Sequence, residues 1–552
     1  MHIMENERLP RRVQVLVAGG GPVGLAAAVE LGRRGVDCLV VEPRSTVSRA
    51  RPRCKTLNVR TMEHLRRWGL ADRLRQRAPL PTSWSQDVVF CTSLAGHELS
   101  RFTGVLGLVP EGDRFAETGQ QAPQYVLEEL LREAVGELAG CRLVLGSRVV
   151  AVDQDDDLVT VTVEDGSGNR SVVTADYVIG CDGPRSTVRD QIGSRYVGEQ
   201  ALRPNFGFVF ESPGLWDHVR HGPAVQYWVV NAAAPALVGP LDRTGTWWAI
   251  AYGVDRETGE RTALDVIEGV AGRPVEARVL STDPWTARMQ IVDRMRNGRV
   301  FLAGDAAHLN PPFGGHGLNT GLGDAVDLGW KLAAVLAGWG GPELLDSYEA
   351  ERRPVQERVI SEATANMRVL STELLADGLD QDDQAGADAR QAAAARIQET
   401  KKAEFHSLEL VLGLRIAASP ILPGEDATAR GPLVGARLPH AFLPDGRSLY
   451  DVLGEHLTLL VRGHGGEEQP FLDAARARGV PLTVVHLASS ADRDYAGLPG
   501  ARLALVRPDQ VVGWLGEEAP KDAPALIDTL SGHTRAGAAH DHRPAGNGIL
   551  DR

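Results

Sequence analysis

Three glycines near the N-terminus have the spacing of a nucleotide-binding turn. Gly19, Gly21 and Gly24 form a GxGxxG pattern between the apolar run VQVLVA and a helix-like segment, and Glu42 ends the next apolar run. The first glycine permits a tight turn, the second lets a pyrophosphate approach the helix N-terminus, and the third lets helix and strand pack closely. Glu42 would accept hydrogen bonds from ribose hydroxyls. The pattern indicates a dinucleotide site and leaves NAD(P) and FAD as alternatives.

Two acidic motifs follow strand-like runs later in the chain. Asp182 and Gly183 come after YVIGC, and Gly304 and Asp305 end the run VFLAGD. Ligands of open α/β sheets bind beyond the carboxyl ends of the strands, where a short acidic side chain can reach the hydroxyls of a polyol. Each motif alone could be an ordinary turn between a strand and a helix.

Together the motifs resemble those of the class A flavoprotein monooxygenases, the aromatic hydroxylases built on the p-hydroxybenzoate hydroxylase plan, over about residues 11–400. In that family the glycine turn and its acid bind the ADP half of FAD, the GD aspartate binds the ribityl chain, and the DG motif serves both FAD and NAD(P)H. The resemblance implies FAD contacts at the matching positions, which are Gly19, Gly21, Gly24, Glu42, Asp182, Gly183 and Asp305. It also implies an arginine and a glutamine at a helix start, best matched by Arg53 and Gln124, with Arg44 a further candidate. A solvated charge or a helix cap is the alternative for these three.

The segment PPFGGHGLN, residues 311–319, leads into a strongly helical stretch. Gly314, Gly315 and Gly317 leave the helix N-terminus bare, so that its amides and the positive end of its dipole can attract an anion. A reduced flavin carries its negative charge at the N1/C2 carbonyl edge, and a helix N-terminus there would favour the reduced state. We therefore expect the flavin ring to lie on this segment, which also contains Leu318 and Asn319.

Two further residues of this segment are expected to act in catalysis. Many family members have glutamine or another residue where this chain has His316, and a histidine there could tune the protonation of flavin or substrate, or be a tolerated variable position. Pro312 resembles the proline whose carbonyl approaches the substrate in relatives.

The stretch from about 190 to 284 breaks into short strand-like runs rich in aromatic residues. This pattern predicts an antiparallel sheet that buries one face against a cofactor domain and offers the other to a flat ligand. Tyr227, Trp228, Trp248 and Trp285 are the candidate substrate contacts, and core packing is the alternative for each.

From about residue 430, strands and helices alternate in a pattern that resembles the C-terminal thioredoxin-like domain of the larger hydroxylases. No cysteine follows Cys181, which excludes dithiol chemistry in that domain.

The expected fold of the whole chain is α/β, with a Rossmann-like FAD-binding domain, an inserted, mainly antiparallel β substrate domain and a thioredoxin-like α/β domain. The expected division is FAD binding at 11–78 (βαβ), 105–189 (DG motif) and 285–400 (GD motif and long helices), substrate domain at 79–104 and 190–284, linker at 401–429, thioredoxin-like domain at 430–535, and disordered tail at 536–552.

Composition narrows the possible partners. The net charge of −13 and the dispersed basic residues argue against nucleic acid or an anionic membrane. The five cysteines are widely spaced, without the Cys/His clustering of a zinc site, and suit a reduced cytoplasm; neither a signal peptide nor a membrane-spanning run is evident. We expect a cytoplasmic monomer or homodimer that uses FAD, NADPH or NADH, O2 and a small aromatic substrate, and no metal.

The resemblance implies hydroxylation of an electron-rich phenolic, polyketide, indolic or pyridine-type molecule, in natural-product biosynthesis or aromatic catabolism. In such enzymes NAD(P)H reduces FAD, and the reduced flavin forms a C4a-hydroperoxide with O2 that transfers oxygen to the ring. One alternative is a flavin-dependent halogenase, whose WxWxIP motif is missing here. Another is a non-catalytic flavin protein that holds an unstable intermediate, against which the retained glycine and acidic motifs argue.

Overall fold

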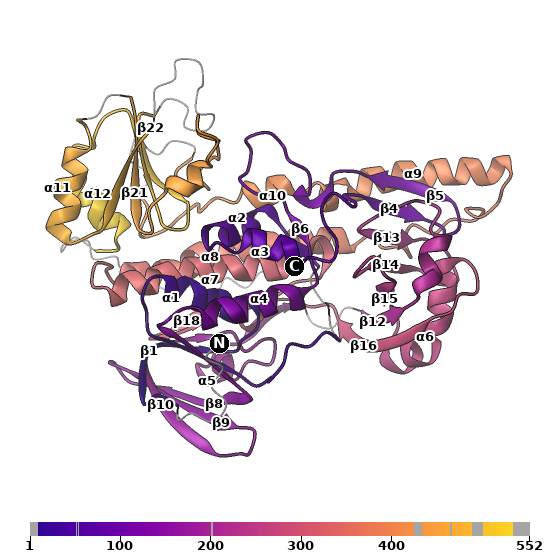
Figure 1. Cartoon of the computed structure of the whole chain (residues 1–552), viewed down its shortest axis with the longest axis horizontal. Coiled ribbons are helices and arrows are strands. Elements are labelled where there is room, and N and C mark those ends of the chain that lie inside the picture. Colours follow the sequence, from indigo (N-terminus) through magenta and orange to yellow (C-terminus); the bar gives the residue numbers. More distant parts are fainter. Residues whose placement is uncertain are drawn as a thin grey trace, which may run out of the picture.

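The computed structural model describes residues 9–50, 52, 55–199, 203–423, 433–463, 466–487 and 501–533. These residues form a central region around a mainly parallel sheet, with a second large sheet on one side and a small α/β unit on the other (Figure 1). The predicted α/β fold class is confirmed. None of the described helices is both long and apolar enough to cross a membrane.

The sheet of the central region has the strand order β18-β19-β10-β1-β2-β7. Its parallel strands are β19 (Val300–Leu302), β10 (Arg170–Gly180), β1 (Arg12–Ala18), β2 (Cys38–Glu42) and β7 (Cys141–Leu145). Antiparallel additions are β18 (Arg296–Asn297), β8 (Ser147–Gln154) and β9 (Val159–Asp165). The strand β2 is buried along its whole length, as expected for a parallel strand covered on both faces.

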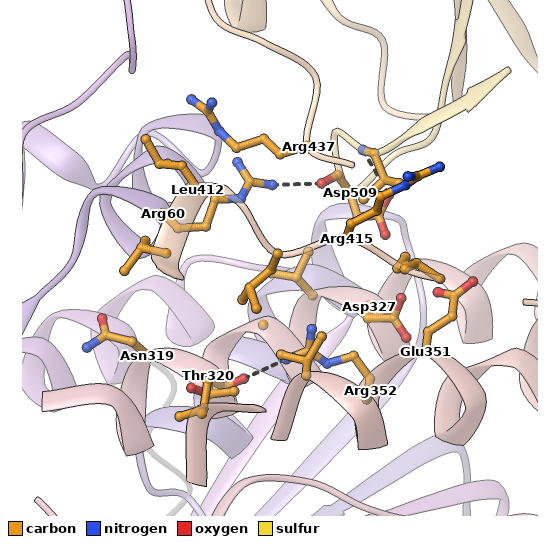
Figure 2. A pocket seen from close by; sticks show the side chains of 18 of the residues that line it. Arg60, Asn319, Thr320, Asp327, Glu351, Arg352, Leu412, Arg415, Arg437 and Asp509 are labelled. Atoms are coloured by element: carbon orange, nitrogen blue, oxygen red, sulfur yellow. Dashed lines mark hydrogen bonds between the residues drawn. The ribbon is translucent and has the colours of Figure 1, made fainter. Parts of the chain in front are cut away.

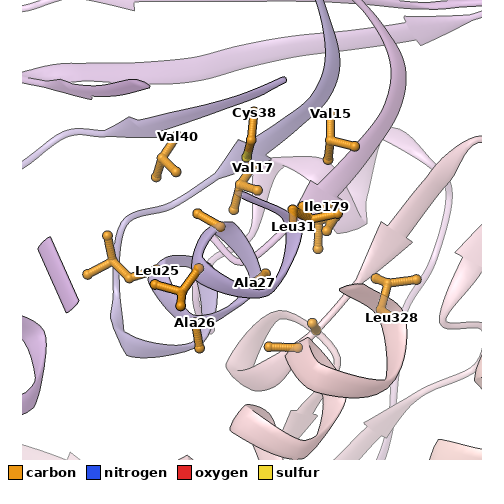
Figure 3. Close-up of a cluster of buried hydrophobic side chains, with 14 of the residues drawn as sticks. Val15, Val17, Leu25, Ala26, Ala27, Leu31, Cys38, Val40, Ile179 and Leu328 are labelled. Atoms are coloured by element: carbon orange, nitrogen blue, oxygen red, sulfur yellow. The ribbon is translucent and has the colours of Figure 1, made fainter. Parts of the chain in front are cut away.

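Helices pack against this sheet, and α1 packs closely because it contributes small alanine side chains to the shared core. Helix α1 (Pro22–Arg33) packs against α4 (Gln124–Gly136) and the long α7 (His316–Leu336), which in turn packs against α8 (Glu343–Met367). Figure 3 shows Ala26 and Ala27 of α1 below the valines of β1 and β2, with Leu328 of α7 to one side. Alanines let the helix approach the sheet without leaving voids.

The second large sheet has the order β16-β12-β15-β14-β13-β4-β5, and all its pairs are antiparallel except β13 with β4. Its strands are β16 (Arg278–Thr286), β12 (Pro204–Glu211), β15 (Thr246–Tyr252), β14 (Ala236–Pro240), β13 (Gln226–Val229), β4 (Val88–Cys91) and β5 (Glu98–Phe102). Helix α6 (Arg256–Ala271) covers one face, and residues of α9 (Gln384–Phe405) pack on the other, which we call the inner face. The early segment that supplies β4 and β5 thus joins the later strands, and α9 runs past the boundary expected at 400.

The C-terminal unit has the strand order β22-β21-β23-β24, with β21 and β22 parallel and the other pairs antiparallel. Its elements are β21 (Leu457–Arg462), α11 (Gln469–Arg478), β22 (Leu482–Leu487), β23 (Leu503–Val506), β24 (Val512–Gly516) and α12 (Ala523–Leu530). This is the thioredoxin-like arrangement. Its core continues into Trp330 of α7 and Leu344 of α8, so the unit is packed on the central region. The tail expected at 536–552 lies outside the described residues.

Short elements connect these parts. The short strands are β3 (Thr56–Leu57) paired with β6 (Gln120–Gln121), and the small sheet β11 (Tyr196–Glu199), β17 (Met289–Val292) and β20 (His308–Leu309). The short α-helices are α2 (Val59–Arg67), α3 (Ala71–Arg77), α5 (Thr187–Gln191) and α10 (Leu408–Leu412). The 3₁₀ turns are η1 (Val105–Gly107), η2 (Pro213–His218), η3 (Gly304–Ala306), η4 (Phe313–Gly315) and η5 (Leu449–Val452).

Candidate active site

The three glycines of the N-terminal turn have different physical roles. A Cβ atom on Gly19, whose φ is +103°, would lie 2.3 Å from the carbonyl oxygen of Cys181, and one on Gly24 would lie 2.0 Å from the carbonyl oxygen of Gly19. A Cβ on Gly21 would meet nothing within 4 Å. Packing therefore requires the first and third glycines, while the second leaves the N-terminus of α1 open to a ligand. This open cradle fits the pyrophosphate of a dinucleotide.

Glu42 is held at the end of β2 by two neighbours. Its carboxylate accepts the amide of Gly20 at 2.7 Å, and the amide and Nε of Arg44 at 3.0 and 2.6 Å. Arg44 also donates to Glu128 at 2.9 Å. A carboxylate has about four acceptor sites, so Glu42 retains capacity for a ribose hydroxyl. Gln124 is half-buried at the start of α4, as expected, whereas Arg53 lies outside the described residues.

The DG motif is turned toward its own helix. Asp182 accepts the hydroxyl of Ser186 and, at 3.1 Å, the amide of Val188. Burial raises the pKa of Asp182, although these hydrogen bonds oppose the shift. Gly183 has a φ of +79°, and a Cβ there would meet nothing within 4 Å. The aspartate thus fixes the start of α5, and the glycine leaves open space beside it.

The GD motif lies against the first glycine turn. A Cβ on Gly304, whose φ is +59°, would lie 2.9 Å from Cγ2 of Val23 in α1. Asp305 has an exposed side chain, and its backbone carbonyl accepts the hydroxyl of Tyr196. The fold therefore brings together the two motifs that the sequence resemblance assigns to one cofactor.

A buried aspartate that sequence reasoning missed supports the GD motif from behind. Asp324 accepts the amide of Gly304 at 3.1 Å and a ring nitrogen of His308 at 2.8 Å, and it also accepts Arg352 and Gln356, each at 2.8 Å. Burial alone would raise the pKa of Asp324, but Arg352 and His308 hold it below its ordinary value. A fixed carboxylate with four donors sets the position of the Gly304 backbone.

The glycine-rich segment forms the bare helix start that its composition predicts. Gly314 and Gly315 have φ values of +80° and +67°, and α7 begins at His316 with no side-chain cap. Asn319 donates to the carbonyls of Gly315 and Thr56 at 2.7 and 2.9 Å. It also accepts the amide of Asn58 at 2.9 Å and the Thr61 hydroxyl at 2.7 Å, so its side chain ties α7 to α2. Gly317 and Leu318 are half-buried beside it.

The two residues expected in catalysis have different surroundings. His316 is 4% exposed, burial lowers its pKa to about 4, and its Nε2 has no hydrogen-bond partner among the described residues. It is therefore neutral at pH 7. Pro312 is exposed, and its carbonyl accepts the amide of Gly315 at 3.1 Å, within the turn itself.

The candidate substrate aromatics do not share one face. Trp228 and Trp248 belong to the inner-face cluster of the second sheet, together with Tyr252 and with Phe313 of the glycine-rich segment. Tyr252 and Phe313 have ring centroids 6.1 Å apart, so this cluster reaches the start of α7. Tyr227 belongs instead to the cluster under α6, where its hydroxyl donates to the Gly222 carbonyl at 2.6 Å. Tyr227 therefore lies on the face of the sheet opposite to Trp228 and Trp248. Trp285 is half-buried on the edge strand β16.

This fold, with its glycine turn, two acidic motifs and uncapped helix start, is the arrangement that the sequence predicts for an FAD-dependent aromatic hydroxylase. A family model described as an FAD binding domain matches residues 12–363, and one described as the C-terminal part of aromatic-ring hydroxylases matches residues 431–533. The chain belongs to this family of flavoenzymes, and the predicted class of enzyme and its FAD cofactor are confirmed.

Relatives cover nearly the whole chain. The tetracenomycin B2 monooxygenase-dioxygenase of Streptomyces olivaceus is 33% identical over 94% of this chain and 97% of its own length. The rebeccamycin biosynthetic enzyme RebC with reduced flavin superposes with a TM-score of 0.86 at 33% identity, covering 96% of this chain and 100% of its own. An aklavinone-11 hydroxylase in a ternary complex with FAD and aklavinone gives a TM-score of 0.80 at 28% identity, covering 95% and 100%.

Proposed function

We propose that this enzyme hydroxylates a phenolic or polyketide-type aromatic ring that binds between the inner face of the second sheet and the glycine-rich segment. The observation that carries the proposal is the contact between Tyr252 of the sheet and Phe313, three residues before α7 begins. This contact places an aromatic wall beside the helix start that we assign to the flavin. Relatives named as a putative polyketide hydroxylase and a 2,4-dichlorophenol 6-monooxygenase support a polyketide or phenolic substrate class.

We assign the FAD contacts to the residues whose surroundings fit them. The open N-terminus of α1 at Gly21 would take the pyrophosphate, Glu42 the ribose, and the exposed Asp305 the ribityl chain. The rest of FAD would contact the open space beside Gly183 and the amides at the start of α7. Bound FAD supplies the redox chemistry that joins NADPH or NADH oxidation to O2 activation.

The residues of this chain would position the flavin and the substrate and would supply a fixed electrostatic field around them. The positive end of α7 would favour negative charge on a flavin bound beside its uncapped first turn. His316 is neutral, so it offers one nitrogen that accepts and one that donates, without adding charge. The aromatic cluster excludes water from the ring that reacts, and buried Trp228 Nε1 and Tyr252 hydroxyl, which have no partner among the described residues, are available to polar groups of a substrate.

The decisive test is spectroscopic and kinetic. The purified protein should show an oxidised flavin spectrum, and phenolic or polyketide compounds should accelerate its NAD(P)H oxidation with formation of a hydroxylated product. Flavin binding without any product from a broad phenolic panel would contradict the proposed substrate class. A protein that cannot be reconstituted with FAD would contradict the cofactor assignment.

The two faces of the sheet provide a matched test of the substrate site. Trp248→Leu on the inner face should raise KM for the aromatic substrate, because it removes part of the apolar wall. Trp247→Leu removes the same side chain from the face under α6 and should leave KM unchanged in the folded fraction. Equal changes in KM for the two variants would refute the assignment of the inner face.

A further inference from the structure

A second cavity lies outside the proposed substrate site, between α7, α8, α10 and the C-terminal unit (Figure 2). Its volume is about 130 Å³, and none of the inner-face aromatics lines it. One part of its wall is aliphatic and is formed by Val355, Val359, Leu410, Leu412 and Ile416. The exposed Arg415 also lines it, which places that side chain where the cavity nears solvent.

Three of the arginines that line this cavity, Arg60, Arg352 and Arg437, are paired with carboxylates. Arg60 donates to Glu63 at 2.8 Å, and Arg437 is bonded to the same carboxylate. Arg352 pairs with Asp324, which is outside the cavity lining, at 2.8 Å. These three guanidinium groups therefore have carboxylate partners, whereas Arg415, at the exposed end of the cavity, donates to the backbone carbonyl of Val434 at 3.0 Å.

A second set of charged groups is satisfied in the same way. Asp327 and Glu351 accept Lys331 at 2.8 and 2.7 Å, and both also accept Arg507 of the C-terminal unit. Figure 2 shows the side chains of Asp327 and Glu351 on α7 and α8, on the side of the cavity opposite Arg437. An occupant is therefore not required for charge balance.

The unpaired groups are instead two neutral imidazoles. His64 and His316 both line the cavity, are 5% and 4% exposed, and have Nδ1 and Nε2, respectively, without a partner among the described residues. Burial, together with Arg60 and Arg67, holds the pKa of His64 well below its ordinary range, and burial alone does so for His316. Buried nitrogens of this kind need a hydrogen-bonding partner, and a hydroxyl can both donate to and accept from an imidazole.

We propose that this cavity is a binding site for a single-ring phenol, separate from the site where the ring is oxidised. An engineered apolar cavity of about 150 Å³ binds benzene, so a cavity of about 130 Å³ has the right size for one aromatic ring. The ring would lie on the aliphatic wall and its hydroxyl on the imidazole of His64. Water alone would satisfy the imidazoles but would leave that wall wetted. The occupant would touch His316 and so contact the first turn of α7.

The test uses the FAD-loaded enzyme and 4-bromophenol, without NAD(P)H. Crystals soaked with this probe should show anomalous bromine density in the cavity, with the hydroxyl at hydrogen-bond distance from His64. Calorimetry in solution should show a binding event that survives Trp248→Leu. Bromine density only at the inner face of the second sheet, water alone in the cavity, or binding at crystal concentration only would each overturn the proposal.

Two variants locate the binding event in solution. Val359→Phe fills the cavity and should abolish it, and His64→Phe keeps a ring but loses the hydrogen bond, which should weaken binding about tenfold. His486→Phe, which alters an exposed histidine of the C-terminal unit, is the matched control and should bind normally. Unchanged affinity in both cavity variants, each with an intact flavin spectrum, would contradict the site even if the probe binds elsewhere.

Discussion

The burial of His316 makes the stability of the enzyme depend on pH in a predictable way. Burial lowers the pKa of His316 from 6.5 to about 4, while the unfolded chain keeps the ordinary value. Below pH 6.5 the unfolded state therefore binds a proton that the folded state refuses, and stability falls until the pH reaches about 4. At 1.36 kcal/mol for each pKa unit, the full effect is about 3 kcal/mol, of which about 2 kcal/mol is lost by pH 5.

His316→Gln should remove this part of the pH dependence. We expect wild type to lose about 2 kcal/mol more unfolding free energy than the variant between pH 7.5 and pH 5. The measurement is urea unfolding followed by tryptophan fluorescence, at constant ionic strength and with FAD in excess. Every other titrating group, including His64, is present in both proteins, so their difference isolates His316.

The control replaces an exposed imidazole, in His486→Gln, and should follow wild type at both pH values. If wild type and His316→Gln lose the same unfolding free energy between pH 7.5 and pH 5, the ring of His316 is not desolvated in solution. The account of this residue as a neutral partner in the proposed flavin site would then fail.

Three other substitutions separate binding from folding. Gly21→Ala places its methyl group in open space, so it should change unfolding free energy by less than about 0.5 kcal/mol yet release FAD on gel filtration. Gly24→Ala puts its methyl group 2.0 Å from a carbonyl oxygen and should cost about 1–3 kcal/mol in urea unfolding; equal stability of these two variants would contradict the assigned roles. Asp305→Ala should lose the flavin colour without unfolding, and full retention would count against the ribityl contact. Arg507→Met leaves Glu351 and Asp327 short of a buried partner and should cost about 3–5 kcal/mol by calorimetry; an unchanged melting profile would show that the cluster contributes nothing.

The sequence was most informative where chemistry depends on neighbours along the chain. The turn at Gly19 and Gly24, the two acidic motifs and the bare start of α7 are each set by a few consecutive residues, and the structure has all of them where they were expected. The fold class followed from the same local patterns. Tyr227 and Trp228 are neighbours in one strand and must face opposite sides of the sheet, but which of them faces inward depends on how the whole sheet is covered, and the sequence did not say that.

Contacts between distant segments were missed for the same reason. Asp324 joins Gly304 to Arg352 of α8, and no local motif names those partners. A signal was nevertheless present, because Asp324, Asp327 and Lys331 place polar side chains at helical spacing on an otherwise apolar α7. A polar stripe on a buried helix implies partners elsewhere, although the sequence does not say which ones.

That stripe also explains what the C-terminal unit contributes without cysteines. Arg507 comes from this unit and meets Asp327 of α7 and Glu351 of α8, while the apolar core of the unit continues into Trp330. The same helix α7 presents its first turn to the proposed flavin site and to the phenol cavity. Because a rigid helix moves as one body, anchoring its middle fixes the position of its N-terminal amides. The thioredoxin-like unit is thus packed on and ion-paired to the helix whose first turn we assign to the flavin, and these contacts need no thiol chemistry.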